Sequence, residues 1–277
     1  MKWKHLKPRL KQVVEEVMVA VVAAEGNVKG IKFPPVLEDF EGWKEKKTIL
    51  VILAHPDDPE FFMGATLARW GALGHEIHYC LLTTGQKGSQ DVNQKPDDLA
   101  AIRKMEQQNA ANTLKVKSVE FLDYVDGEVV PDLEMRKKIV RIIRTYKPQI
   151  VVSSDPLNYF PGDNRVNHPD HRAVGQVVLD AVFPAAGNPN FFHELISEEN
   201  LAPVNVAELW FSIPAEANLV VDVTQYFDEK IKAILCHHSQ LNMDDQAFEE
   251  MLKTRWVSFN EQMQPVFLER FRRIVFG

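Results

Sequence analysis

Apolar runs rich in β-branched residues alternate with helical patterns along much of this chain, and no other feature limits the fold as strongly. The runs that we predict as strands are "TILVILA" (48–54), "EIHYCLLT" (76–83), "SVEFLD" (118–123) and "QIVVSSD" (149–155). Helical patterns cover 59–73, 97–114, 132–146 and 169–183. This alternation predicts a parallel sheet with helices on both faces. The strands are apolar almost throughout, as expected of strands buried on both sides.

We predict one α/β domain over residues 1–277, because no repeat, low-complexity tract or linker divides the chain. Its core, 48–240, should hold a Rossmann-like parallel sheet with mixed edges and helices on both faces. Further strands are expected near 207–212 and 219–223, and two or three helices should finish the chain. Residues 1–47 lie outside this core, and we expect a helix followed by a loop there.

The charge balance and the cysteine content limit the partners and the cell compartment. With 32 Lys and Arg against 39 Asp and Glu, the net charge is −7. This argues against a dedicated nucleic-acid binder, because such a protein needs a clustered basic face. Cys80 and Cys236 make no disulfide framework, so we expect a reducing, cytoplasmic setting.

The N-terminal segment has a basic start and a short apolar run, features that superficially resemble a signal peptide. Glu15 and Glu16 interrupt the run and leave only Val17 to Ala24 uncharged, so we predict an amphipathic helix instead. This helix is a candidate contact in a homo-oligomer, and packing on its own domain would explain it equally well. No run approaches the roughly 20 apolar residues of a membrane span, so we expect no membrane insertion.

Three polar side chains crowd the end of the first predicted strand, in the stretch "AHPDDPE". In open α/β sheets, ligands bind outside the carboxyl ends of the strands. Asp58 can cap the helix that follows, and Gly74 should end that helix. A cap needs only one side-chain oxygen, however, and leaves His55 and Asp57 unexplained. We therefore predict a functional site at this turn.

The stretch "NHPDHRAVG" repeats the His-Pro-Asp pattern beyond the strand at 149–155. His168 and His171 are three residues apart, so they face the same way at the start of a helix. Two such turns, each expected to begin a helix after a sheet strand, are hard to obtain by accident. We expect the two turns to serve one site.

The residue types in these turns are typical of a metal hydrolase. A catalytic zinc site has three protein ligands from His, Asp or Glu and keeps one position open for water. His55, Asp58 and His171 would supply such ligands, and Asp57 and His168 would remain free for proton transfer. Zinc is the expected ion, although these ligand types also accept Fe²⁺, Co²⁺ or Mn²⁺.

Together, "AHPDDPE" and "NHPDHRAVG" resemble the two motifs of the PIG-L (LmbE-like) family of zinc-dependent N-acetylglucosaminyl deacetylases. The likeness covers about 48–240, and its supporting stretches are "LLTTGQKGS", "IRKMEQQNAANTL", "YVDGEV" and "KIKAILCHHSQ". The resemblance implies that His55, Asp58 and His171 bind zinc. It also implies that Asp57 is the general base and that His168 stabilises the tetrahedral intermediate and helps the amine to leave.

The resemblance further implies a small-molecule substrate, an amino-sugar conjugate from which an N-acetyl group is hydrolysed. Arg103 matches an arginine that contacts substrate in some members of the family, and Asp126 matches an acidic residue near that pocket, so both are expected to bind substrate. Tyr159 and Asn167, in the loop before the second turn, are expected to line a sugar site, as are their neighbours Asn158 and Phe160. Family members often have a glycine-rich run where this chain has "FFMGAT", and we expect its two phenylalanines to pack against the sheet.

Two alternatives stay open beside the deacetylase. One is a catalytically silent, metal-containing binding protein of the same fold. The other is a metal-dependent phosphoester hydrolase, although two-metal sites normally need more carboxylate ligands than are clustered here. The glycine-rich motif of a dehydrogenase and the Gly-x-Ser-x-Gly motif of a serine hydrolase are both absent.

Overall fold

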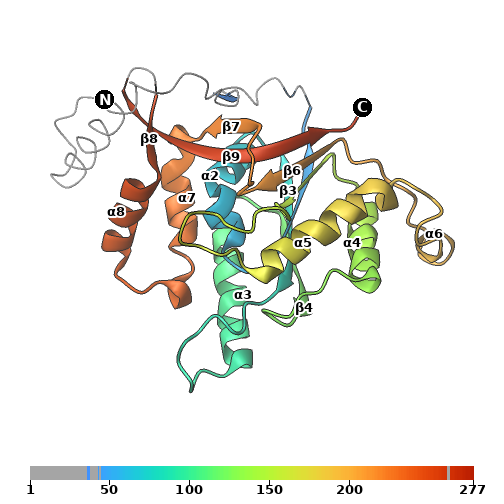
Figure 1. Ribbon diagram of the computed structural model, residues 1–277, viewed down its shortest axis with the longest axis horizontal. Helices are drawn as coiled ribbons and strands as arrows, with labels where there is room; N and C mark the ends of the chain where they lie inside the picture. Colours follow the sequence, from blue (N-terminus) through green and yellow to red (C-terminus); the bar gives the residue numbers. More distant parts are fainter. Residues whose placement is uncertain (1–35, 38–42, 44, 261–262) are drawn as a thin grey trace.

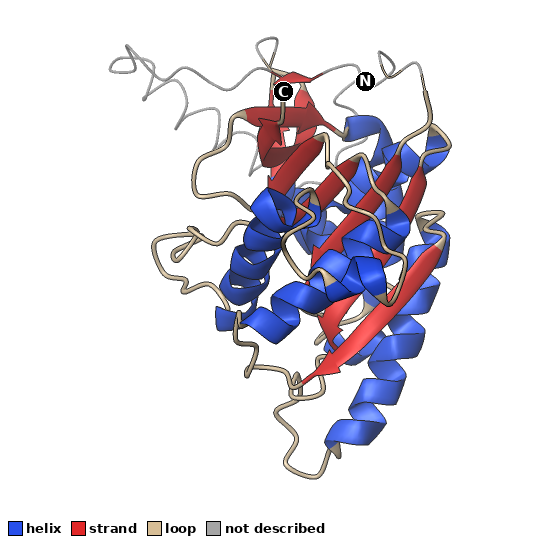
Figure 2. Cartoon of the chain, turned by 90° about the vertical axis from the view of Figure 1, so that its right-hand side faces the viewer, coloured by secondary structure: helices blue, strands red, loops and turns tan. Residues whose placement is uncertain are grey.

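A central, mostly parallel β-sheet is covered by helices on both faces (Figures 1 and 2). The computed structural model describes residues 36–37, 43, 45–260 and 263–277. The predicted N-terminal helix lies outside the described residues. Within them, the strand order of the sheet is β1-β7-β9-β6-β5-β2-β3-β4, and β8 pairs with β9.

The strands are β1 (Val36–Leu37), β2 (Thr48–Leu53), β3 (Glu76–Thr83), β4 (Ser118–Tyr124), β5 (Ile150–Ser154), β6 (Glu208–Ser212), β7 (Leu219–Asp222), β8 (Val257–Phe259) and β9 (Pro265–Val275). The α-helices are α2 (Asp58–Ala72), α3 (Pro96–Thr113), α4 (Leu133–Tyr146), α5 (Pro169–Asp180), α6 (Glu194–Ser197), α7 (Phe227–Ile234) and α8 (Asp245–Trp256). A π-helical turn, Ala181–Ala186, extends α5. None of the described helices is long and apolar enough to cross a membrane.

The predicted α/β class is confirmed, and strand β2 shows how the sheet divides the core. Its alternate residues face opposite ways, as in any strand. Ile49 and Val51 pack in the apolar layer that contains Trp70 of α2. Leu50 lies in the other layer, with Ile139 of α4. Because β2 is buried on both faces between β3 and β5, its end opens only at the edge of the sheet where the first His-Pro-Asp turn begins.

The prediction for the C-terminal part was wrong in one respect. The helices α7 and α8 do form, but β8 and β9 follow them, and β9 lies antiparallel between β6 and β7. The sequence of β9 does not show the apolar pattern of a strand, because two charged residues flank Phe271 on the face of β9 that packs against the core. Glu269 pairs with Lys230 at 2.7 Å, and Arg273 pairs with Glu208 at 2.7 Å. The sheet thus extends beyond the predicted core, and β1 lies within the segment predicted as a loop.

Helix α2 differs from the prediction at its start. Asp58 is its first residue, and Asp57 occupies the cap position with a left-handed backbone (φ 82°) and no capping side-chain hydrogen bond. Gly74 follows the end of the helix at φ 80°, as expected. The helix is broken at Met63, and just beyond the break Glu269 of β9 accepts hydrogen bonds from the backbone N–H groups of residues 65 and 66, at 3.2 and 2.8 Å.

Candidate active site

The fold brings the two His-Pro-Asp turns together at the carboxyl ends of β2 and β5. His55 directly follows β2, and His171 lies in the first turn of α5. The atoms His55 Nδ1 and His171 Nε2 are 3.2 Å apart, and Asp58 Oδ1 is 3.1 Å from the same His171 nitrogen. A second oxygen of Asp58 lies 3.5 Å from His55 Nδ1. Three side chains from two turns that are distant along the chain thus converge on one point.

These separations match the edges of a metal coordination shell. Zinc–nitrogen and zinc–oxygen bonds are about 2.0 Å long, so neighbouring ligand atoms of a tetrahedral site lie about 3.3 Å apart. The trio His55, Asp58 and His171 is one of the described groups whose ligand atoms could hold a metal ion. The residue types and the distances therefore fit a zinc-like cation.

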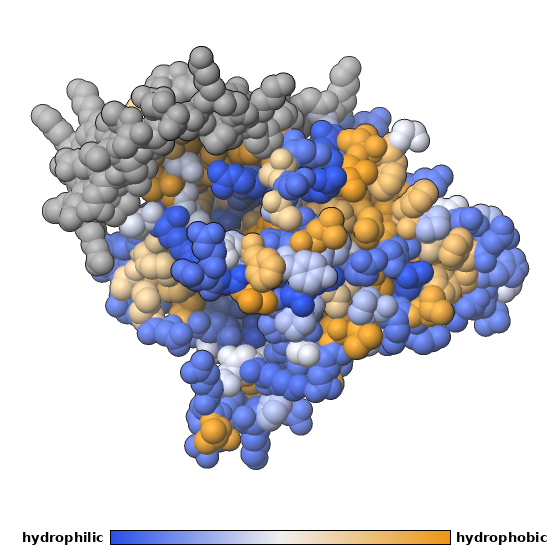
Figure 3. Space-filling view, in the orientation of Figure 1, coloured by the Kyte–Doolittle hydropathy of each residue, from blue (hydrophilic) through white to orange (hydrophobic). Residues whose placement is uncertain are grey.

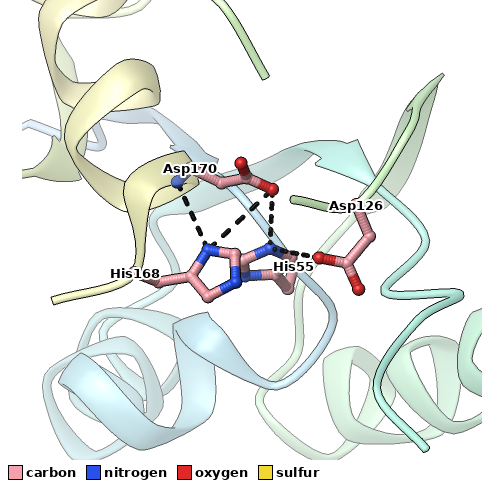
Figure 4. Close-up of side chains that lie close together, drawn as sticks. All are labelled: His55, Asp126, His168 and Asp170. Carbon is pink, nitrogen blue, oxygen red and sulfur yellow. Dashed lines mark hydrogen bonds and ion pairs between the residues drawn. The ribbon is translucent and has the colours of Figure 1, made fainter. Parts of the chain in front are cut away.

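Hydrogen bonds on the far sides of both rings support this assignment. His171 Nδ1 lies 2.9 Å from Asn167 Oδ1, which can only accept, so His171 carries its proton there and turns the lone pair of Nε2 toward the site. His55 Nε2 lies 3.1 Å from Asp170 and 3.2 Å from Asp126, both carboxylates (Figure 4). A partner of this kind fixes the tautomer of a metal-ligating histidine.

Asp170 is the site residue that the sequence analysis missed. It is fully buried, and its carboxylate accepts hydrogen bonds from the backbone N–H groups of Gly127 and Val129, at 2.7 and 3.3 Å, as well as facing His55. Burial favours a raised pKa for Asp170, but the bonds from His55 and Gly127 outweigh it and lower that pKa. Its position in the repeated His-Pro-Asp pattern was a signal that could have found it.

Negative charge is in excess around the His55 ring. Burial alone would lower the pKa of His55, but Asp126, Asp170 and Asp58 together raise it well above its ordinary value. Burial alone would raise the pKa of Asp58, but His171 and His55 outweigh this effect and hold that pKa far below its usual range. A cation between the rings and Asp58 would balance these carboxylates.

Asp57 stands beside this trio in a different environment. Burial raises the pKa of Asp57 to about 6, although the Arg103 guanidinium opposes the rise. Arg103 lies 3.1 Å from Asp57 Oδ2 and donates to the backbone carbonyls of Pro56 and Gly85, at 2.7 and 2.9 Å. Arg103 is thus buried and holds the first turn, and Asp57 is a carboxylate whose pKa suits proton transfer near neutral pH.

His168 lies on the open side of the site. It is the cap residue of α5, and its Nδ1 accepts a hydrogen bond from the backbone N–H of Asp170 at 3.2 Å. Its ring meets the His55 ring edge to face, with 4.6 Å between the ring centres. Burial and the neighbouring His55 lower the pKa of His168. Because the cap occupies Nδ1, Nε2 is the atom that remains available.

Three of the residues predicted to bind substrate contact other parts of the site. Asp126 accepts from the backbone N–H of Lys87 and faces His55, and Asn167 faces His171. Arg103 holds the first turn, as described above. The fourth, Tyr159, is half exposed, and its ring stacks under the guanidinium of Arg172 at 4.7 Å.

A cleft of about 960 Å³ opens beside His168 and His171. Its walls include Asn158, Phe160 and Asn167 from the loop before α5, and aromatic residues of α2 and α8. Hydrophilic and hydrophobic residues are intermixed over the middle of the face shown in Figure 3. The expectation for "FFMGAT" was only partly right. Phe61 packs against Phe248 and Trp256 rather than the sheet, and both phenylalanines of that stretch line the cleft.

Comparison with known proteins identifies a family whose matched region includes both His-Pro-Asp turns. Residues 50–182 match the PIG-L model, described as GlcNAc-PI de-N-acetylase. The chain is also 34% identical over 205 residues to a diacetylchitobiose deacetylase of Thermococcus kodakarensis, with 74% of each protein covered. The chain belongs to the PIG-L family. The matched residues include both turns and the positions of Arg103 and Asp126.

Other members extend the comparison beyond this region. A probable N-acetyl-alpha-D-glucosaminyl L-malate deacetylase of Bacillus anthracis is 26% identical over 71% of this chain and 83% of its own length. The solved structure of the N,N'-diacetylchitobiose deacetylase from Pyrococcus horikoshii superposes with a TM-score of 0.75 at 29% identity, over 93% of this chain and 92% of that one. The likeness to this solved structure thus extends well beyond the residues that match the family model.

Proposed function

We propose that this PIG-L protein is a metal-dependent deacetylase that hydrolyses the N-acetyl group of a small molecule containing N-acetylglucosamine. One observation carries the proposal: the ligand atoms of His55, Asp58 and His171 converge at metal-shell distances, directly beside the carboxylate of Asp57. The relatives support the choice of substrate, because their names refer to acetylated glucosamine compounds.

In this proposal His55, Asp58 and His171 hold the metal ion. Zinc in such a site acidifies a coordinated water to a pKa of about 7 and polarises a carbonyl oxygen. Zinc is our choice for nitrogen and carboxylate ligands of this kind, and Fe²⁺, Co²⁺ or Mn²⁺ would also fit the ligand types. Asn167 and Asp170 keep the two imidazoles in the tautomer that binds metal.

Asp57 and His168 have different roles in the reaction. Asp57 accepts a proton from the attacking water, for which a pKa near the working pH is favourable. His168 presents its Nε2–H on the open side, where it can donate a hydrogen bond to the amide oxygen and so help the amine to leave. The departing amine can take up the proton that Asp57 accepted from the water, because a neutral His168 whose Nδ1 accepts from Asp170 has no second proton to give. These roles place the scissile amide between the two side chains.

The residues that line the cleft support a sugar as the substrate. Aromatic faces next to amide side chains, such as Phe160 beside Asn158, suit the apolar face and the hydroxyl groups of a sugar. The cleft exceeds the space that one N-acetylglucosamine unit needs, so we expect a conjugate. The substrate-binding roles of Arg103, Asp126, Tyr159 and Asn167 stay predictions, and for three of them the contacts favour an indirect role that positions the site.

The proposal also covers domain organisation, location and partners. We propose that the chain forms one domain with its core at 48–240, that it acts in the cytoplasm and that it binds no nucleic acid. A homo-oligomer formed through the N-terminal segment stays a prediction as well.

The test is release of acetate and free amine from a panel of N-acetylglucosamine conjugates, with chelator-treated protein as the control. Release that stops with chelator and returns with zinc is the expected result. Hydrolysis of phosphoesters in place of amides would favour the phosphoester alternative. Metal bound at full occupancy without any turnover would favour the silent binding protein.

A further inference from the structure

Asp57 has a backbone conformation that residues with a side chain usually avoid. Its φ of 82° lies in the left-handed region, and its own side chain makes no capping bond to the helix that follows. Such a conformation persists only where the surroundings impose it. Some neighbour must therefore hold the backbone of the proposed base.

Gln107 of α3 is that neighbour. Its Oε1 accepts the backbone N–H of Asp57 at 2.9 Å, and the side chain is fully buried. Its Nε2 donates to both oxygens of Glu60, at 3.0 and 3.1 Å. A carboxylate only accepts and an N–H only donates, so the orientation of this amide is fixed by its two partners.

Two further contacts make the arrangement rigid. Glu60, also fully buried, has His237 Nε2 3.2 Å from one of the oxygens that Gln107 contacts. Arg103, one turn before Gln107 on α3, holds the carbonyl of Pro56 and the carboxylate of Asp57. The helix α3 thus contacts the first turn at the carbonyl before Asp57, at the N–H of Asp57 and at its side chain.

We propose that Gln107 is a positioning residue for the deacetylation: it holds Asp57 in the left-handed conformation from which the base reaches the site, and Glu60 orients Gln107 for this task. The inference rests on the proposed function, in which Asp57 is the base. It assigns no contact with substrate or metal to either residue.

The central variants are Gln107→Leu, which removes both amide groups at similar size, and Gln107→Glu, which places two carboxylates together. The exchange Glu60→Gln with Gln107→Glu should restore the network. The carboxylate introduced at position 107 would accept from the Asp57 N–H and from the amide introduced at position 60. The carbonyl of that amide would in turn accept from His237. Gln108→Leu is the matched control, because Gln108 is the next residue of α3 and is exposed.

We expect kcat of the zinc-loaded Gln107→Leu enzyme to fall about 10- to 100-fold, the loss typical of outer-shell partners. KM and zinc content should stay near the wild-type values, because the contacts among His55, Asp58 and His171 do not involve Gln107. The exchange variant should recover most of kcat. A merely structural role would instead lower the melting temperature and leave kcat per folded, zinc-loaded molecule unchanged.

Crystal structures of the wild type and the variants test the inference without any turnover. In the wild type Asp57 should keep its positive φ, and in Gln107→Leu, or in Gln107→Glu if the first does not fold, it should leave the left-handed region. Retention of that conformation in the variants, or a kcat within about two-fold of wild type, would overturn the inference. If the wild type releases no acetate, the proposed function fails, and the crystal structures still decide whether Gln107 holds the turn.

Discussion

The two His-Pro-Asp turns share a sequence pattern, but they differ in which residue is buried: the histidine in the first turn and the aspartate in the second. In the first turn the His55 side chain is 10% exposed and that of Asp57 is 20% exposed. In the second turn the His168 side chain is 41% exposed and that of Asp170 is completely buried. The buried members meet each other, with His55 Nε2 3.1 Å from Asp170 Oδ2. The more exposed residue of each turn, Asp57 or His168, is the one to which we assign a role in the reaction itself.

The start of the following helix explains this difference. In the first turn the helix begins at the fourth residue, Asp58, after a left-handed residue. In the second it begins at the second residue, Pro169, and His168 serves as the cap. A shift of the helix start thus exchanges the buried and open positions, while the fourth residue of each turn, Asp58 or His171, still reaches the shared point. In the proposed function, one short motif thus supplies a ligand set, a general base and a hydrogen-bond donor to the amide oxygen.

The largest effect is expected from substituting the two histidines of the second turn, which should differ in their effect on zinc binding. His171→Asn should weaken zinc binding by more than about 100-fold, a loss larger than that of an outer-shell partner, and should abolish activity. His168→Asn should keep zinc bound and lower kcat by about 10²- to 10⁴-fold. Zinc titration and acetate release would measure both. Loss of zinc from the His168 variant would show that the open histidine is a ligand.

The open carboxylate of the first turn gives the next effect. Asp57→Asn should retain zinc and lower kcat by about 10²- to 10⁴-fold, because the general base is lost while the ligands remain. The exposed Asp91 provides the control, and Asp91→Asn should leave kcat unchanged. Activity that survives in the Asp57 variant would exclude Asp57 as the base.

The buried carboxylate of the second turn should have a smaller effect. Asp170→Asn weakens the hydrogen bond to His55 and places an amide near the Gly127 N–H. We expect a loss of about 10- to 100-fold in zinc affinity or in activity, to be followed by competition with a chelator and by turnover. An unchanged zinc affinity together with unchanged turnover would mean that Asp126 alone orients His55.

The smallest effect tests the backbone of each turn. At Asp57, which has a positive φ, the Gly variant should be more stable than the Ala variant by about 1 kcal/mol. At Asp170, which is helical, the order should reverse by a similar amount. Thermal unfolding with chelator present compares each pair, and both members of a pair lack the carboxylate. The same order at both positions would contradict the difference in helix start.

Much of this fold follows from local pattern. The strands β2 and β3 could be predicted to within a residue because long apolar runs buried on both faces leave little choice. The strand β9 could not be predicted, because Glu269 and Arg273 on its inner face find partners only in the folded chain. A charge that is neutralised by a distant residue looks, in the sequence, like a charge in water.

The site divides in the same way. The trio His55, Asp58 and His171 could be named from residue types and spacing, and the structure brings these side chains together. Asp170 and Gln107 were not predicted, because they bond other residues of the site instead of supplying a ligand or a base, and residue types alone do not show such pairings. The prolines do indicate that the two helices start at different places, because the first helical positions favour proline. Pro59 follows the first motif, whereas Pro169 lies inside the second motif and begins its helix.

The bond from Glu269 to α2 has a consequence for biosynthesis. The amide groups beyond the break in α2 and the carboxylate that satisfies them are more than 200 residues apart along the chain. A nascent chain therefore emerges from the ribosome with both His-Pro-Asp turns long before the helix after the first turn can be completed. In the proposed function, a metal ion bound during that interval would meet a site in which Glu269 does not yet support α2. Correct metal loading should thus depend on timing as well as on affinity.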